Sequence, residues 1–363
     1  ELAPTVAKAE ADALQPLLER LLLCQLQGRE PLLLDATELA GLNSATKAAL
    51  LQLPLVLIEL GSQGAELWSR RQHQGQQSLL EELEQRLHQH QGLLLTGGAG
   101  TGKTTRVRQL LANETARKTL LLVPTGKAAA RLREALSPLP ASMHCATLHR
   151  ALEANASGGF GRHHDRPLNT DVVVVDEVSM VDTNLMRALL EALPTSTRLI
   201  LVGDSAQLPP IDGSSVLEPL EQQLKTNRPE LLLQLERSHR FNDTTALGSF
   251  VQQLRQDTSP SALQQQLSEL DQESNLRWWP LQRGWPLELK QRMEKHRQNL
   301  AQQANDVSLS DEEALACLDD LLVLSPRRSG LQGVTQLNRR WLPLTQREPW
   351  HWPAGTPLLG GRN

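Results

Sequence analysis

The sequence predicts an α/β fold in which helices flank a parallel sheet, preceded by a small helical domain. Four short apolar runs are typical of strands buried on both faces: 93–96, 119–123, 172–175 and 199–202. Helical patterns separate these runs, and after Lys103 the side chains of Val107, Leu110 and Leu111 recur at one-turn spacing. Strands that alternate with helices favour a parallel sheet built from right-handed crossovers.

The regions on either side of the predicted sheet have different patterns. Residues 1–75 are Leu-rich with helical spacing and predict a helical domain, and the Gly- and Gln-rich stretch 61–77 predicts a linker. Residues 243–320 are polar, Gln-rich and predicted to be helical, and the apolar run 321–324 predicts a strand that opens a second α/β unit. The expected domains are therefore 1–75, 76–242 and 243–363.

The composition is that of a globular protein with two or three domains. The chain has 363 residues, of which 39% are hydrophobic and 21% charged. The longest apolar stretch, 51–60, is too short to span a bilayer, and acidic residues near the start are unlike a signal peptide. Cys24, Cys145 and Cys317 lack metal-ligand spacing and are typical of a reducing cytoplasm, which is the expected location.

Charge is unevenly distributed along the chain. The formal net charge of −4 does not by itself indicate a nucleic-acid-binding protein. Residues 1–96 contain 7 Lys and Arg against 12 Asp and Glu, whereas residues 97–166 contain 11 against 4. A basic segment of this kind can neutralise phosphates. On charge alone, a solvated helical face is the favoured interpretation.

A glycine-rich loop that fits the phosphate-binding pattern lies between the first predicted strand and a helix. Its glycines let backbone N–H groups surround phosphate oxygens, and the helix N-terminus faces the same anion. Lys103 is expected to reach the β- and γ-phosphates of ATP, and Thr104 to ligate Mg²⁺. A chance glycine-rich turn is the alternative, which the strand–loop–helix context disfavours. The residues expected to bind the nucleotide are Gly97, Gly98, Ala99, Gly100, Thr101, Gly102, Lys103, Thr104 and Thr105.

Two later strands of the predicted sheet end in polar residues. The run 172–175 leads into Asp176 and Glu177; Asp176 is expected to hold Mg²⁺ and Glu177 to deprotonate the attacking water. The run 199–202 leads into a turn that carries Gln207 to the edge where ligands bind in open α/β sheets. Gln207 is expected to sense the γ-phosphate. An ordinary strand end and a turn with a solvated glutamine are the alternatives.

Six segments resemble, in this order, the motifs of superfamily 1 DNA helicases: GGAGTGKTT, VPTGKAAARL, ATLHRAL, VVVVDEVSMVD, LVGDSAQLPP and LERSHRF. The forms DEVSM, GDSAQLPPIDGSSVL and SPRRSGLQGVTQLNRR resemble those of the RecD family, the alpha subunits of exodeoxyribonuclease V. The resemblance covers roughly residues 77–363 and is most specific over 93–241. It implies a RecA-like P-loop NTPase domain over 76–242 and an incomplete second RecA-like domain with a helical insertion over 243–363.

The resemblance also implies roles for individual residues. Lys103, Glu177, Gln207 and Arg240 match catalytic positions of the family. In that family the glutamine couples the γ-phosphate to DNA, and the arginine reaches the γ-phosphate from the domain interface. A guanidinium there would stabilise the charge of the transition state. A surface ion pair is the alternative for Arg240.

Four residues fall in motifs that contact single-stranded DNA in the family: Thr125, Lys127, Thr147 and His149. Hydroxyl groups, lysines and backbone N–H groups are the usual phosphate contacts. A zinc site is the competing interpretation for His149, but the spacing of the neighbouring histidines does not support it. Those neighbours are His144, His163 and His164.

The implied function is that of an ATP-dependent helicase subunit that moves 5′→3′ along single-stranded DNA during double-strand-break repair and recombination. Its expected partners are duplex-end DNA and the beta and gamma subunits, RecB and RecC, and residues 1–75 are expected to dock on those subunits. Two late motifs of the family, a Thr-His-Lys-Ser-Gln-Gly element and an arginine-bearing one, do not occur in the sequence. Nuclease activity is expected only through partner subunits. The alternatives are a structural or DNA-binding subunit whose nucleotide site does not drive translocation, and a P-loop ATPase that acts on protein.

Overall fold

The structure is a computed structural model that divides into two compact units, residues 1–257 and 258–363. It describes residues 8–26, 31–60, 64–112, 114, 116–155, 158–210, 214–236, 245–255, 259–270, 276–279, 285–325, 327–330, 332–341 and 355–356.

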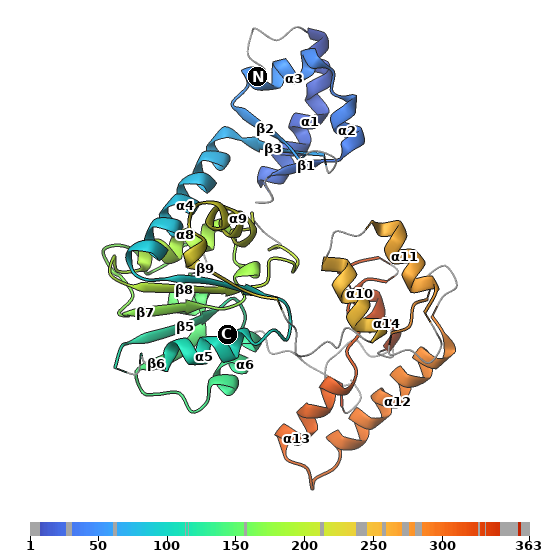
Figure 1. The fold of residues 1–363 in the computed structure, drawn as a ribbon. Coiled ribbons are helices and arrows are strands. Elements are labelled where there is room, and N and C mark those ends of the chain that lie inside the picture. Colours follow the sequence, from blue (N-terminus) through green and yellow to red (C-terminus); the bar gives the residue numbers. More distant parts are fainter. Residues whose placement is uncertain are drawn as a thin grey trace. The chain divides into compact units, whose positions relative to one another are not determined.

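A six-stranded parallel sheet forms the centre of the first unit (Figure 1). Its strands, in spatial order, are β6 (Met143–Thr147), β5 (Thr119–Val123), β7 (Val172–Val175), β8 (Arg198–Gly203), β4 (Leu93–Gly97) and β9 (Leu232–Leu235). The four predicted strands are confirmed as the inner strands β4, β5, β7 and β8. The two edge strands, β6 and β9, were not predicted, since edge strands carry polar side chains and lack a continuous apolar run.

Helices cover both faces of this sheet (Figure 1). On one face, α4 (Arg70–Gln89), α8 (Thr183–Ala192) and α9 (Leu217–Asn227) contribute leucines to the larger core cluster. On the other face, α5 (Lys103–Leu111) and α6 (Gly126–Leu136) pack with the smaller cluster. The short helix α7 (Leu148–Ala151) follows β6. The glycine-rich loop follows β4 and the acidic pair follows β7, and β8 lies between these strands. The fold is thus the predicted RecA-like P-loop fold.

The N-terminal region contains a sheet that the sequence analysis did not predict. Three helices, α1 (Lys8–Leu26), α2 (Ala36–Gly41) and α3 (Ser44–Gln52), accompany a three-stranded antiparallel sheet. Its strands, in the order β1-β3-β2, are β1 (Leu32–Leu34), β3 (Ala65–Ser69) and β2 (Leu55–Glu59). The three helices agree with the expected helical domain, and the sheet is an addition to it. Leucine-rich runs of three to five residues fit a helix or a buried strand equally well, and here pairing between strands decided.

The predicted linker over 61–77 is also wrong where the structure describes it. Residues 65–69 form β3, and α4 begins immediately afterwards at Arg70. The Ser69 hydroxyl caps this helix by accepting a hydrogen bond from Gln72 N. The buried side chains of Leu79, Leu83 and Leu87 anchor the helix to the sheet. Packing of this apolar stripe therefore overrides the local Gly and Gln composition.

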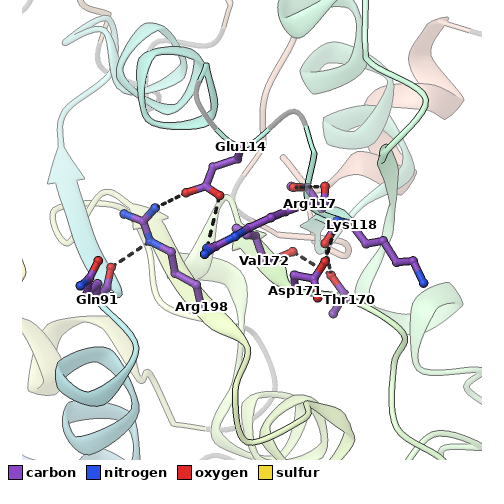
Figure 2. A network of polar contacts seen from close by, with 9 residues as sticks. Gln91, Glu114, Arg117, Lys118, Thr170, Asp171, Val172 and Arg198 are labelled. Carbon is purple, nitrogen blue, oxygen red and sulfur yellow. Dashed lines mark hydrogen bonds and ion pairs between the residues drawn. The ribbon is translucent and has the colours of Figure 1, made fainter.

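Polar contacts close the amino-terminal edge of the parallel sheet (Figure 2). Arg198, at the start of β8, donates to Gln91 O at 2.9 Å and pairs with Glu114 at 2.6 Å. Asp171, before β7, accepts a hydrogen bond from Lys118 N at 2.9 Å. These contacts tie the starts of four neighbouring strands together and leave the opposite edge for ligands.

The described residues of the second unit form helices and no strand. These helices are α11 (Pro260–Ser268), α12 (Leu287–Ala304), α13 (Asp311–Ala316) and α14 (Val334–Trp341). The predicted strand over 321–324 is wrong: Leu322 and Leu324 are 60% and 89% exposed, and no described strand of this unit offers them hydrogen-bond partners. A second RecA-like domain over 243–363 stays a prediction.

The helix α10 (Ala246–Arg255) belongs to the first unit. The sequence predicts a domain boundary after residue 242, whereas the two compact units of the structure divide after Asp257. Among the described helices, none combines the length and the apolar character needed to cross a bilayer.

The packing of α4 makes a prediction about stability. Leu83 is 0% exposed, so Leu83→Ala is expected to lower the free energy of unfolding by about 2–5 kcal/mol. Leu51→Ala is the matched control, because Leu51 is 65% exposed and its truncation should change stability by no more than about 0.5 kcal/mol. Urea denaturation followed by circular dichroism measures both. Equal losses in the two variants would contradict the assignment of Leu83 to the core.

Candidate active site at the carboxyl edge of the sheet

The glycine-rich loop forms a turn between β4 and α5. Gly100 and Gly102 adopt φ values of +74° and +87°, in the left-handed region that glycine enters without strain. Gly102 is the N-cap of α5, and no side chain caps the first turn of this helix. The first N–H groups of α5 and the positive end of its dipole therefore face an anion-binding position.

Lys103, the first residue of α5, folds back over the loop. Its Nζ donates hydrogen bonds to the carbonyl oxygens of Gly97 and Gly98 at 2.6 and 3.0 Å. The Thr101 hydroxyl also donates to Gly98 O, at 2.9 Å. A Cβ at Gly97 would lie 2.7 Å from the carbonyl oxygen of Leu235, so a side chain there requires the backbone to move. The loop is thus a compact cradle with its lysine at the centre.

Asp176 and Glu177 follow β7 at the same edge. Asp176 Oδ1 accepts a hydrogen bond from Glu177 N at 2.9 Å. Burial raises the pKa of the Asp176 carboxyl to about 6, although the Glu177 N–H and the Lys103 ammonium favour its ionised form. Glu177 has a φ of +56°, a left-handed conformation that is uncommon and strained for a residue with a side chain.

Gln207 lies in the turn after β8 and is joined to the turn after β7. Its Oε1 accepts a hydrogen bond from the Ser179 hydroxyl at 3.2 Å. Ser179 is buried in the short 3-10 helix η2 (Val178–Met180), which begins directly after Glu177. No motif in the sequence marks Ser179, although its position two residues after the acidic pair is a signal that points to it.

The four residues expected to contact DNA gather near the carboxyl ends of two neighbouring parallel strands. Thr125 and Lys127 follow β5, and Thr147 and His149 lie at and beyond the end of β6. The threonines are the N-caps of α6 and α7, and their hydroxyls accept hydrogen bonds from the first turns of those helices. Lys127 and His149 are exposed. Their roles in DNA binding stay predictions.

Two other expectations have different outcomes. Arg240 lies outside the described residues, so its role stays a prediction. Among the residues that the structure describes, the group that could hold a metal ion is His163, His164 and Asp165, whose ligand atoms lie within 4.8 Å of one another. This group includes neither His144 nor His149, so it does not support zinc as the reason for His149.

The residues at this edge of the sheet are suited to bind a nucleoside triphosphate together with Mg²⁺. The glycine cradle, the uncapped start of α5 and Lys103 suit phosphate oxygens. The Thr104 hydroxyl and the Asp176 carboxylate are the hard oxygen donors that Mg²⁺ prefers. Asp176 has no ion-pair partner within the described part of the chain, and a bound cation would favour its ionised form.

Comparison with known proteins places these motifs in a family. A family model described as an AAA domain matches residues 81–212. The RecBCD enzyme subunit RecD of Mycobacterium tuberculosis (strain H37Rv) is 35% identical over 297 residues, which is 73% of this chain and 49% of that protein. The subunit of Mycolicibacterium smegmatis is 36% identical over 298 residues, 74% of this chain and 51% of that protein. The resemblance to RecD is confirmed. This chain spans about half the length of these RecD relatives.

Two further matches cover a smaller share of this chain. The ATP-dependent RecD2 DNA helicase of Deinococcus radiodurans is 41% identical over 139 residues, 38% of this chain and 19% of that protein. The solved structure of the Pif1 helicase from Candida albicans has 17% sequence identity and a TM-score of 0.36, and the match covers 62% of this chain and 53% of that chain. A TM-score this low does not support a fold assignment. The fold is assigned from the strand order of the parallel sheet.

The buried carboxyl of Asp176 makes a prediction about pH. The pKa of this group rises from 3.8 to about 6 in the folded protein, so the folded state holds the proton more tightly than the unfolded state. The contribution of Asp176 to wild-type stability should therefore fall as pH increases from about 4 to about 6, and this loss persists at higher pH. The Asp176→Asn variant has no carboxyl to ionise at this position, so it does not lose this stability. The difference in the free energy of unfolding between the variant and wild type should therefore grow in the variant's favour across this window, by at most about 3 kcal/mol.

Thermal denaturation of the two proteins between about pH 4 and pH 7, without nucleotide or Mg²⁺, measures this difference. Asp12→Asn is the control, because Asp12 is an exposed carboxylate of α1, outside the site. A difference between Asp176→Asn and wild type that stays constant over this window would contradict the prediction.

Proposed function

We propose that the chain is an ATP-dependent DNA helicase subunit of an exodeoxyribonuclease V type complex, moving 5′→3′ along single-stranded DNA during double-strand-break repair and recombination. The observation that carries the proposal is the arrangement of Lys103, Asp176 and Gln207, which follow β4, β7 and β8 at one edge of the sheet. The names of the relatives, a RecBCD subunit and an ATP-dependent DNA helicase, support it.

Lys103, Thr104 and Asp176 form the nucleotide-binding part of the proposal. The ammonium group of Lys103 would exchange the loop carbonyl oxygens for the β- and γ-phosphate oxygens of ATP. The Thr104 hydroxyl and the ionised Asp176 carboxylate would hold Mg²⁺, which supplies neutralising charge to the phosphates when it is bound.

Glu177 and Gln207 form the hydrolytic and sensing part. Glu177 would orient the attacking water and accept its proton. The hydrogen bond between Gln207 and Ser179 links the turn that carries Glu177 to the turn that senses the γ-phosphate. Arg240 would add a second charge to the γ-phosphate from the domain interface.

Single-stranded DNA would bind beyond the carboxyl ends of β5 and β6. Thr125, Lys127, Thr147 and His149 offer hydroxyl, ammonium and imidazole groups to phosphates there. The excess of Lys and Arg over 97–166 supports this position. RecB and RecC are the proposed partner subunits, and DNA cleavage would belong to a partner.

The deciding experiment is ATP hydrolysis by the purified chain with and without single-stranded DNA. Strong stimulation of ATP hydrolysis by DNA would support the function of a helicase subunit. Nucleotide binding without turnover would instead favour a structural or DNA-binding subunit whose nucleotide site does not drive translocation.

Lys103→Ala is expected to abolish ATP turnover while the fold persists, because the substitution removes the phosphate-binding cation and leaves the sheet intact. Lys118→Ala is the matched control, since Lys118 lies at the opposite edge and its Nζ donates to Asn169. Steady-state hydrolysis and circular dichroism report turnover and fold. Normal turnover in Lys103→Ala would rule out the phosphate-loop assignment.

Glu177→Gln is expected to bind ATP with nearly wild-type affinity but to hydrolyse it roughly 10²–10⁴-fold more slowly, because only proton acceptance from water is lost. Equilibrium binding and single-turnover hydrolysis separate these two effects. A collapse of ATP affinity in this variant would show that Glu177 instead maintains the structure of the site.

A further inference from the structure

Arg255 brings a second cation to the phosphate loop. It is the last residue of α10, far from the loop in sequence, and belongs to the same compact unit. Its Nη2 donates to Asp204 Oδ2 at 2.8 Å. Asp204 lies just beyond β8 and is only 3% exposed, so this ion pair holds the guanidinium beside the buried edge of the sheet.

The guanidinium lies directly against Gly98. A Cβ built on Gly98 would lie 2.2 Å from Arg255 Nη1 and 2.4 Å from its Cζ and Nη2. The absence of a side chain at Gly98 therefore lets the guanidinium approach the loop backbone. The carbonyl oxygen of the same glycine accepts a hydrogen bond from Lys103 Nζ at 3.0 Å. The two cations thus meet at one residue of the loop.

This position selects the phosphate that Arg255 can reach. The lysine of such a loop extends to the β- and γ-phosphates. Because Arg255 and Lys103 both lie against Gly98, Arg255 can reach the same phosphates. A guanidinium has five N–H donors in a planar fork, and Asp204 is the acceptor it contacts in the described part of the chain. The remaining donors can bind phosphate oxygens, while Asp204 fixes the orientation of the fork.

We infer that Arg255 is a phosphate-binding residue for the terminal phosphate of a nucleoside triphosphate, and that Asp204 positions it. The inference rests on the proposed nucleotide site but does not depend on hydrolysis or on DNA. It is separate from the role expected of Arg240. Loss of the Arg255 guanidinium should therefore weaken binding of a triphosphate more than binding of a diphosphate.

The test compares ATPγS and ADP binding to the full chain by isothermal titration calorimetry with Mg²⁺. Arg255→Ala is expected to weaken the binding of ATPγS by about tenfold or more, which corresponds to the loss of one charge-assisted hydrogen bond. The binding of ADP should weaken by less than about threefold. Arg106→Ala is the matched control: it removes an exposed arginine of α5 that bonds to Gln109, and both affinities should stay unchanged.

Unchanged ATPγS affinity in Arg255→Ala, or equal losses for the two nucleotides, would overturn the inference and leave Arg255 as a structural tie between α10 and β8. If Arg255→Ala does not fold, Arg255→Lys gives the same comparison, because an ammonium cannot serve Asp204 and a phosphate in one plane. If wild type binds neither nucleotide, the proposed function itself is wrong, which separates the two failures.

Discussion

The parallel packing of β7, β8 and β4 is the constraint on which the rest of the structure depends. The side chains of Leu94, Leu95, 172–175 and 199–202 are 0% exposed, and they lie on both faces of the sheet. A strand covered on both faces has no place for an unpaired polar side chain along its length. Polar chemistry is therefore confined to the strand ends, and the parallel direction brings those ends together.

The two edges of the sheet solve this constraint differently. At the amino-terminal edge, charged and polar groups pair with one another, as in the contacts of Arg198 with Glu114 and of Lys118 with Asp171. At the carboxyl edge, Asp176 is buried without an ion-pair partner among the described residues, and Glu177 is held in a left-handed conformation. Both features cost stability, and such local costs are typical of sites shaped for a ligand.

The sequence was most informative where a residue type had a single physical reason. Gly100 and Gly102 need positive φ values, and a polyvaline run such as 172–175 fits only a strand buried on both faces. It was least informative where partners decide the structure. β6 and β9 are edge strands with mixed polarity, and the leucine runs around β1 and β2 became strands because a third strand paired with them.

The run 321–324 is the converse case, an apolar segment for which the described residues offer no pairing strand.

Contacts between residues far apart in the sequence could not be predicted either. The contact of Arg255 with Asp204 joins residues 51 positions apart, and the hydrogen bond between Ser179 and Gln207 joins residues 28 positions apart. No local pattern indicates such pairs, because the strand order that brings them together is a property of the whole sheet.

The fold-back of Lys103 changes what an affinity measured at this site means. Its ammonium group already has two acceptors, the carbonyl oxygens of Gly97 and Gly98. A nucleotide therefore competes with an intramolecular partner at fixed effective concentration, and the observed Kd reports an exchange of bonds. Weak affinity for a triphosphate would accordingly be compatible with strong individual contacts, and the two hydrogen bonds of Lys103 fix the shape of the loop.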